Sequence, residues 1–348
     1  MNVPKLRFKE FNDEYARLKY KDVLKIKSGK DQKQIEDENG KYPILGTGGQ
    51  IGKTNSFLYD KPSVLIGRKG TINKPQYMES PFWTVDTLFY SHIYEPNIPK
   101  YLFYSFQNVN WKKYDESTGV PSLSSSTIES VECSIPSPNE QIKIANFLSL
   151  LDRKIELQTK KIEDLKLFKL SKYSLVFSNS NNKIKLSDIC IIEKGKQINS
   201  DLLIEKGNYY MLNGGILPSG YLNEYNTNEN TITISEGGNS CGHINFNKTK
   251  FWCGGHCYKI ISSSVNTSYL YHLLKHNEKI IMNLRVGSGL PNIQKKDLEA
   301  LKLSIHKNDE QLKIGILFDT FDKKIYFENN KLNKLIELKK GLMQNMFV

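Results

Sequence analysis

The chain has 348 residues, of which 39% are hydrophobic and 11% aromatic, so it is long enough for two folded domains of ordinary size. No run of about 18 apolar residues is present and the start does not resemble a signal peptide, so we expect no membrane span and a cytoplasmic protein. Five scattered cysteines indicate reduced thiols rather than a disulfide framework. The 49 Lys+Arg against 37 Asp+Glu give a net charge of +12, which favours a polyanionic partner such as nucleic acid.

The predicted elements follow one order that occurs twice along the chain. Residues 1–140 contain short β-type runs separated by Gly, Asn and Ser, and a helical segment follows at 141–177. The polar stretch SNSNN (178–182) has no periodicity and is typical of a linker. It opens a second β-rich part, 178–308, and the segment 309–348 is again helical. The clearest β-type runs are 63–66, 231–234 and 258–261.

The second half of the chain repeats the first. NEQIKIANFLSLLDRKIEL (139–157) is matched by DEQLKIGILFDTFDKKIYF (309–327), and GVPSLSSSTIESVECSIP (119–136) by GLPNIQKKDLEALKLSIH (289–306). The other matches pair 26–30 with 192–196, 45–49 with 212–216, 64–70 with 232–238, Phe82-Trp83 with Phe251-Trp252, and Tyr101-Leu102 with Tyr269-Leu270. A period of this length indicates two duplicated domains rather than a solenoid of short units.

Both helical segments carry apolar residues at heptad spacing. The seam positions are Leu148, Leu151, Ile155, Ile162 and Leu165 in the first segment, and Phe318, Phe321, Ile325, Leu332, Leu335 and Leu342 in the second. The pattern predicts that the two helices pair as an antiparallel coiled coil about a pseudo-twofold axis. Packing of each helix on its own domain is the alternative. Gln158 and Glu328 fall at equivalent seam positions, which we expect to be solvated rather than paired.

Three groups of residues could carry metal or acid chemistry, and each has a simpler interpretation. The cysteines and histidines between 241 and 257 could ligate zinc, but the segment has no CxxC pair and its match in the first copy has no Cys or His, so we expect no metal. His272 and His276 lack an HExxH motif and are predicted to be surface histidines. Glu337 and Lys339 mimic a nuclease pattern but lie in the helical seam.

Enzymatic motifs are missing from the sequence. A methyltransferase needs a Gly-rich cofactor loop after a strand and a catalytic loop such as Asn-Pro-Pro-aromatic, and neither occurs. No P-loop is present either, which excludes an ATP-driven motor in this chain. We therefore expect a protein without catalytic residues and without a cofactor.

Several segments resemble the specificity subunits of type I restriction-modification enzymes. They are PKLRFKEFNDEYARLKYKDV, the paired GRKGTIN...PFWTVDTLFY and SEGGNSCGHINF...KFWCGGHCYKI, the following STGVPSLS and GSGLPNIQ, and PSPNEQIKIANFLSLLDRKIE. The resemblance covers essentially the whole chain. It implies an α+β protein with two tandem mixed α/β target-recognition domains, each followed by a long helix, the two helices pairing as an antiparallel coiled coil. It also implies that each domain reads one half of a bipartite DNA site and that the subunit performs no chemistry.

The resemblance implies several partners. These are double-stranded DNA, two DNA adenine methyltransferase subunits and ATP-dependent restriction subunits, with no membrane involved. Because the two copies differ in sequence, we expect an asymmetric target. A helix of about 38 residues is roughly 57 Å long, enough to hold two domains over half-sites about 34–36 Å apart. A non-enzymatic coiled-coil scaffold, or a general DNA-binding protein, is the alternative.

Gly-rich loops recur at matching places in both copies. Glycine lets backbone N–H groups approach phosphates, and flanking Lys or Arg supply charge, although plain β-turns are the competing interpretation. Arg68 and Arg285 are the favoured contacts, since an Arg fork suits both guanine edges and phosphates. The candidate DNA-binding residues are Ser28, Lys30, Thr47, Gly48, Arg68, Lys69, Thr118 and Gly119 in the first domain, and Lys194, Lys196, Asn213, Gly214, Asn239, Arg285, Ser288 and Gly289 in the second.

Overall fold

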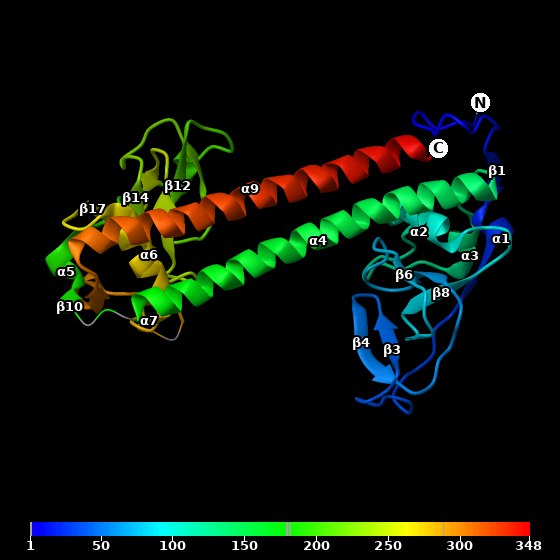
Figure 1. Ribbon diagram of the computed structural model, residues 1–348, viewed down its shortest axis with the longest axis horizontal. Helices are drawn as coiled ribbons and strands as arrows, with labels where there is room; N and C mark the ends of the chain where they lie inside the picture. The colour runs from blue at the N-terminus through cyan, green and yellow to red at the C-terminus, as the bar shows by residue number, and fades with distance from the viewer. Residues whose placement is uncertain (1, 179, 181, 288) are drawn as a thin grey trace. The chain divides into compact units, whose positions relative to one another are not determined.

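The computed structural model describes residues 2–178, 180, 182–287 and 289–348 (Figure 1). The chain forms two compact units, and each is described by itself. Unit 1 is Met1–Thr159 together with Lys331–Val348, and unit 2 is Lys160–Asn330. The long helices α4 (Pro138–Phe177) and α9 (Asn308–Met346) therefore contribute residues to both units.

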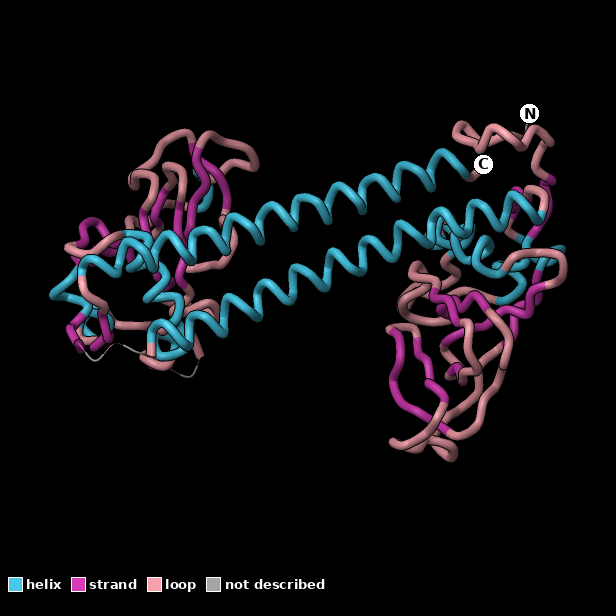
Figure 2. The backbone as a smooth tube through the Cα atoms, viewed as in Figure 1, coloured by secondary structure: helices cyan, strands magenta, loops and turns pink. Residues whose placement is uncertain are grey.

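Unit 1 contains short strands and helices ahead of α4, joined by long loops (Figure 2). The strands are β1 (Ala16–Lys19), β2 (Leu24–Lys27), β3 (Tyr42–Gly46), β4 (Gly49–Thr54), β5 (Ser63–Gly67), β6 (Gln76–Met78), β7 (Trp83–Thr84), β8 (Leu88–Ile93) and β9 (Glu132–Ile135). The helices are α1 (Tyr20–Val23), α2 (Pro99–Asn108), a 3-10 turn η1 (Trp111–Tyr114) and α3 (Ser125–Ser130).

The strands of unit 1 form three small sheets, with strand orders β2-β8-β5-β6, β4-β3-β7 and β1-β9. Strand β5 reads SVLIG and is buried at every position, because an apolar, β-branched run suits a strand covered on both faces. Helix α2 begins at Pro99, whose missing N–H needs no partner at a helix start, and it buries Tyr101, Leu102 and Phe106. These side chains form the core of unit 1 with the first turns of α4.

Unit 2 repeats this arrangement sheet by sheet. Its sheets have the orders β11-β17-β14-β15, β13-β12-β16 and β10-β18. The parallel pair β3–β7, with Ile44 opposite Trp83, reappears as β12–β16, with Met211 opposite Trp252. The predicted duplication is confirmed. The strands are β10 (Asn182–Lys185), β11 (Cys190–Lys194), β12 (Tyr209–Leu212), β13 (Gly220–Leu222), β14 (Thr231–Ser235), β15 (Ile244–Asn247), β16 (Trp252–Cys253), β17 (Cys257–Ser263) and β18 (Lys302–Ile305). The helices are α5 (Leu186–Ile189), the 3-10 turn η2 (Ser200–Leu202), α6 (Thr267–His276), α7 (Glu278–Met282) and α8 (Lys295–Glu299).

Helices α4 and α9 run antiparallel in each unit, as the heptads predict. In unit 2, Lys161 lies 2.8 Å from Glu328, and Lys169, further along α4, lies 2.5 Å from Asp322, which comes earlier in α9. The seam residue Glu328 is buried, so the prediction that its position is solvated is wrong. Lys161 on α4 supplies the positive charge that the buried Glu328 carboxylate needs.

The helix ends also pack into the domain cores, which the seam pattern did not predict. In unit 1, Met343 and Met346 at the end of α9 and Phe347, the residue after it, belong to the core, and Phe347 stacks on Tyr101 with ring centroids 5.3 Å apart. In unit 2, Phe177 from the end of α4 takes the matching place, 5.9 Å from Tyr269. The helices therefore pair with each other and also complete both cores.

His272 is fully buried in unit 2, so the prediction of a surface histidine is wrong for this residue. Its ring nitrogens lie 2.7 Å from the Tyr173 hydroxyl of α4 and 3.0 Å from the Asp319 carboxylate of α9. These bonds tie α6 to both long helices. Burial lowers the pKa of His272 although Asp319 opposes that shift, and burial also lowers the pKa of His276.

Within the described part of the chain, none of the helices combines the length and the apolar content that crossing a bilayer requires. The five cysteines are all buried, and each is a free thiol outside any disulfide. Among the described residues, no three Cys, His, Asp or Glu side chains converge in a way that could hold a metal ion.

Candidate nucleic-acid interface

In unit 1, three of the predicted loops are anchored on one turn, Thr84–Thr87, which joins β7 to β8. The Lys30 N–H donates to the Thr84 carbonyl at 2.9 Å, and the Arg68 N–H donates to the Thr87 carbonyl at 2.8 Å. The N–H of Val85 donates to the carbonyl of Leu45, at the end of β3, at 3.0 Å. The loops after β2, β3 and β5 are therefore gathered at one end of the unit.

The fourth predicted loop joins this cluster through the segment that follows Gly119. The Gly70 N–H donates to the Pro121 carbonyl at 2.8 Å, and the Leu123 N–H donates to the Arg68 carbonyl at 2.9 Å. Thr47 in the β3–β4 turn is the nearest side chain to Gly70, with its Oγ1 3.8 Å from where a Cβ would stand. Unit 1 thus brings together the four loops that carry its eight predicted residues.

Unit 2 builds the same cluster on the turn Cys253–His256. The Lys196 N–H donates to the Cys253 carbonyl at 2.9 Å, and the Glu236 N–H donates to the His256 carbonyl at 2.9 Å. The Gly238 N–H donates to the Pro291 carbonyl at 3.0 Å, which reproduces the bond between Gly70 and Pro121. Each unit therefore presents equivalent loops on an equivalent frame.

Comparison with known proteins shows which family the chain belongs to. The model for the type I restriction modification DNA specificity domain matches the chain twice, at residues 12–167 and 179–338. The chain belongs to this family. Its two specificity domains correspond to the two copies in the sequence, and most of each long helix falls inside the matched ranges.

Relatives of the specificity-domain chain carry matching names. A protein named as a type I specificity subunit in Mycoplasma pneumoniae is 34% identical over 170 residues, covering 47% of this chain and 44% of that protein. The MjaIX specificity subunit of Methanocaldococcus jannaschii is 24% identical over 335 residues, covering 83% of this chain and 77% of that protein. With the first two curated relatives, the chain spans less than half of the relative's length.

A solved structure shares the fold of the specificity-domain chain along its whole length. The crystal structure of a type I restriction-modification S subunit from M. genitalium matches with a TM-score of 0.74 at 21% identity, covering 99% of each chain. At this identity the match establishes the fold alone.

Gly29 and Gly195 belong to the Gly-rich loops, for which we expected glycine to admit phosphates, but the structure gives them a different role. A Cβ at Gly29 would stand 2.0 Å from the Val85 carbonyl oxygen, and one at Gly195 would stand 2.2 Å from the Gly254 carbonyl oxygen. These glycines let the loop of each unit pack against the turn at Thr84–Thr87 or Cys253–His256, which we call the central turn. The adjoining N–H groups of Lys30 and Lys196 are already bonded to that turn. Gly48, by contrast, has no atom within 4 Å of such a Cβ and is exposed.

The predicted residues differ in what remains available on their side chains. Gly214 is buried, and the Asn213 Oδ1 accepts the His256 N–H at 3.0 Å, so both support the turn. Lys194 is paired with Glu236 at 2.6 Å. Thr47 is half-buried. Ser288 lies outside the described residues. Exposed predicted residues are Ser28, Lys30, Gly48, Arg68, Lys69, Thr118, Gly119, Lys194, Lys196, Asn239, Arg285 and Gly289.

The two specificity domains differ most sharply in charge at one equivalent position. Arg68 in unit 1 is exposed and its backbone is fixed by two hydrogen bonds, whereas its counterpart in unit 2 is Glu236. The Glu236 carboxylate lies 2.6 Å from Lys194 and also accepts the Tyr258 hydroxyl at 3.2 Å. The same frame therefore carries opposite charges in the two domains.

The central turns were missed as part of the site. A signal for them was present, because the Phe-Trp pair that precedes each turn occurs in both copies. The indole N–H of Trp83 donates to the Lys30 carbonyl at 3.0 Å, and that of Trp252 donates to the Lys196 carbonyl at 2.9 Å. The repeated tryptophans hold the first loop against the turn.

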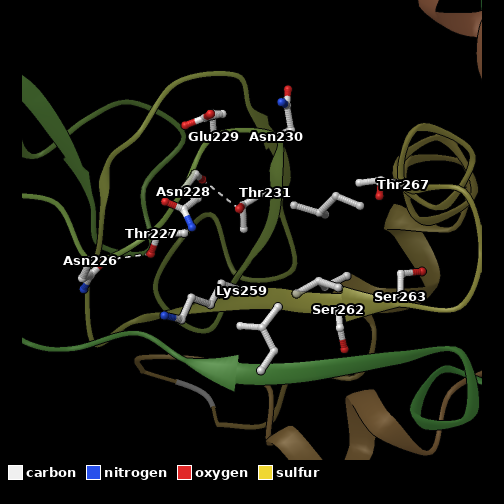
Figure 3. A pocket seen from close by; sticks show the side chains of 13 residues that line it. Asn226, Thr227, Asn228, Glu229, Asn230, Thr231, Lys259, Ser262, Ser263 and Thr267 are labelled. Carbon is white, nitrogen blue, oxygen red and sulfur yellow. Dashed lines mark hydrogen bonds between the residues drawn. The ribbon is translucent and has the colours of Figure 1, made fainter.

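A cavity of about 340 Å³ in unit 2 lies apart from the loop cluster (Figure 3). It is lined by the Asn226–Thr231 loop, by Lys259 and by Ser262, Ser263 and Thr267. This is the start of β14 and the end of β17, whereas the loop cluster lies at the opposite ends of the same strands. The cavity contains none of the predicted residues.

Proposed function

We propose that this chain is the DNA sequence-recognition subunit of a type I restriction-modification complex. Each domain reads one half of a bipartite site, and the chain positions methyltransferase and restriction subunits without catalysing a reaction. Family membership supports the class of function. The observation that carries the two-part reading is the presence of one loop cluster in each unit on the same hydrogen-bonded frame.

The proposed target is asymmetric. The two clusters share their backbone frame but differ at one position, which holds the exposed Arg68 in one domain and Glu236, engaged by Lys194 and Tyr258, in the other. Arg68 can donate to a guanine edge or a phosphate, whereas the second domain has a carboxylate rather than a cation at this position. Equivalent frames with different donors and acceptors support two different half-sites.

The proposed DNA contacts are the exposed members of the predicted set. Among them, the cations Lys30, Arg68, Lys69, Lys196 and Arg285 supply charge for phosphates or guanine edges. We keep the proposed domain limits at 1–140 and 178–308, with spacer helices at 141–177 and 309–348. The core positions of Met343 and Phe347 indicate that the second spacer also stabilises the first domain.

The proposed partners are double-stranded DNA, two adenine methyltransferase subunits and ATP-dependent restriction subunits. The names of the relatives support this class of assembly, and the net charge of +12 supports a polyanionic ligand. Recognition of cellular DNA places the protein in the cytoplasm in this proposal. No cofactor is assigned to the chain itself.

The proposal is tested with the purified full chain and its partner methyltransferase. The chain alone should neither methylate nor cut DNA, and with the partner and S-adenosylmethionine it should direct methylation to one gapped site. Arg68→Ala should weaken binding to that site, while Arg17→Ala is the matched control on the separate β1–β9 sheet. If Arg68 contacts a phosphate, the variant should reduce the dependence of log affinity on log salt concentration by about 1. If Arg68 contacts a guanine, the variant should relax sequence specificity at one base position. Methylation by the isolated chain, or equal binding by both variants, would contradict the proposal.

A further inference from the structure

The most exposed large apolar side chains outside the long helices include one at the same position in each copy. Val120, between Gly119 and Pro121, is 65% exposed, and its counterpart Leu290, between Gly289 and Pro291, is 86% exposed. A single exposed apolar residue needs no explanation. Two at matched places, each at the tip of a loop in the candidate interface, call for a common cause.

Both loops are closed at the base, so the apolar tip is held outward. In unit 1, the Asp115 Oδ1 accepts the N–H groups of Ser117 at 3.0 Å and Ser122 at 2.9 Å, and the Glu116 N–H donates to the Ser122 carbonyl. These bonds lower the pKa of the Asp115 carboxyl, which keeps it charged and able to accept them.

The base of the second loop is closed by backbone bonds. Val286 and Asn292 exchange two N–H···O bonds of 2.8 and 3.0 Å. These two bonds in unit 2 are between main-chain groups, whereas unit 1 adds the Asp115 carboxylate to a main-chain bond. The bonds at the base of the loop differ between the two domains, whereas both tips carry an exposed aliphatic side chain, Val120 or Leu290. This indicates that the aliphatic side chain itself has a function.

The tips also sit beside the exposed cations of the interface. The segment after Val120 pairs with the loop that carries Arg68 and Lys69, through the bridge between Lys69 and Ser122. Arg285 precedes the second loop directly and is exposed. Val120 is therefore linked to cations through this pairing, and Leu290 is close to one in the chain. These cations could contact phosphates.

We propose that Val120 and Leu290 each contact a thymine methyl group in the major groove, one in each half-site. Aliphatic side chains cannot hydrogen-bond to base edges, and the thymine 5-methyl is the apolar group that the major groove offers. Val120 and Leu290 are therefore specificity-determining residues that favour a thymine in each half-site. This inference rests on the proposed DNA-recognition function.

The test replaces thymine by uracil, which removes only the methyl group. The duplex is the one selected by the wild-type full chain from a random pool, and each thymine is replaced in turn. The proteins are wild type, Val120→Ser, Leu290→Ser and the control Leu150→Ser, an exposed leucine on α4. Equilibrium binding is measured by anisotropy at several salt concentrations.

Wild type should lose about fourfold in affinity at one thymine in each half-site, as expected for one buried methyl. Val120→Ser should lose a similar factor on the thymine duplex and become insensitive to uracil at one of those positions only. Leu290→Ser should become insensitive at the other. The salt slope should not change, because no phosphate contact is removed, and Leu150→Ser should behave as wild type.

The inference is overturned if no uracil position couples to either variant. It is also overturned if the serine variants bind DNA normally but lose the methyltransferase, since the tips would then dock a protein. If wild type selects no duplex, the proposed function fails and the inference falls with it. Wild-type selection with uncoupled variants overturns the inference alone.

Discussion

The Lys169 ammonium of α4 lies 2.5 Å from the Asp322 carboxylate of α9, and the equivalent pair, Lys339 and Asp152, lies 2.6 Å apart with the helices exchanged. One pair belongs to unit 2 and the other to unit 1. The same lysine and aspartate of the repeat thus pair across the two antiparallel helices within each unit.

The first prediction tests the pair in unit 2. Replacing Lys169 by Met should lower the free energy of unfolding by about 1 kcal/mol. The covered Lys169 side chain strengthens the pair, whereas solvent at the partly exposed Asp322 screens it and keeps the loss small. Lys169→Asp combined with Asp322→Lys should recover part of the loss of the single reversals. The measurement is a double-mutant cycle by urea denaturation, and zero coupling energy would mean that the pair is not formed.

The second prediction concerns the end of α9. Phe347→Ala should lower the stability of unit 1 by about 3 kcal/mol, since the ring is buried against Tyr101. Tyr326→Ala on α9, the helix that Phe347 follows, is the control, because Tyr326 is 63% exposed and should change stability by less than about 0.5 kcal/mol. Hydrogen exchange of β5 and β8 locates the effect. Normal protection in Phe347→Ala would show that the core does not depend on the helix end.

The third prediction separates glycines that pack from glycines that are free. Gly29→Ala should cost about 3 kcal/mol, because its Cβ would collide with the Val85 carbonyl, a backbone atom. Gly48→Ala should leave stability within about 0.5 kcal/mol, since nothing lies near its Cβ. Thermal unfolding distinguishes the two. Equal melting temperatures would mean that the loop at Gly29 moves aside freely.

The fourth prediction is a pH dependence in unit 2. The pKa of His272 is lowered below its ordinary value of 6.5, chiefly by burial, so the unfolded chain takes up a proton more readily than the folded one. Stability from this residue is complete above pH 6.5 and falls as pH drops toward the folded pKa. His276 acts in the same direction. His272→Gln should be less stable at neutral pH and lose less stability on acidification, measured by urea titration between pH 7.5 and pH 5. An unchanged slope would contradict this role.

The duplication, the heptad seams and the recurrence of the Gly-rich loops at matching places could all be predicted, because each leaves a repeated pattern in the residues. The gathering of these loops on one turn was seen only in the structure. Matched residues such as Pro121 and Pro291 indicated equivalent loops, and they accept equivalent bonds. Periodicity identifies the buried face of a helix but not what covers it. The heptads therefore gave no signal that Phe347 and Phe177 lie in the domain cores. They also gave no signal that Glu328 is buried with a lysine as its counter-charge.

The chemistry of single residues was harder to predict. Glycine marks a tight approach without saying what approaches, so Gly29 could have met a phosphate or a carbonyl, and the structure places a carbonyl there. His272 carried no local sign of burial, because its partners Tyr173 and Asp319 come from distant segments. Lys194 looked like a free cation until its position across from Glu236 was known.

The central claim is that this chain selects a bipartite DNA target for a partner methyltransferase. The most direct measurement is a genome-wide map of methylated adenines in cells with and without the chain. The account predicts one gapped, asymmetric motif that disappears on deletion, and exchange of residues 20–135 for those of a related subunit should change one half of that motif and leave the other unchanged. An identical map in both cells, or a swap that changes both halves together, would contradict it.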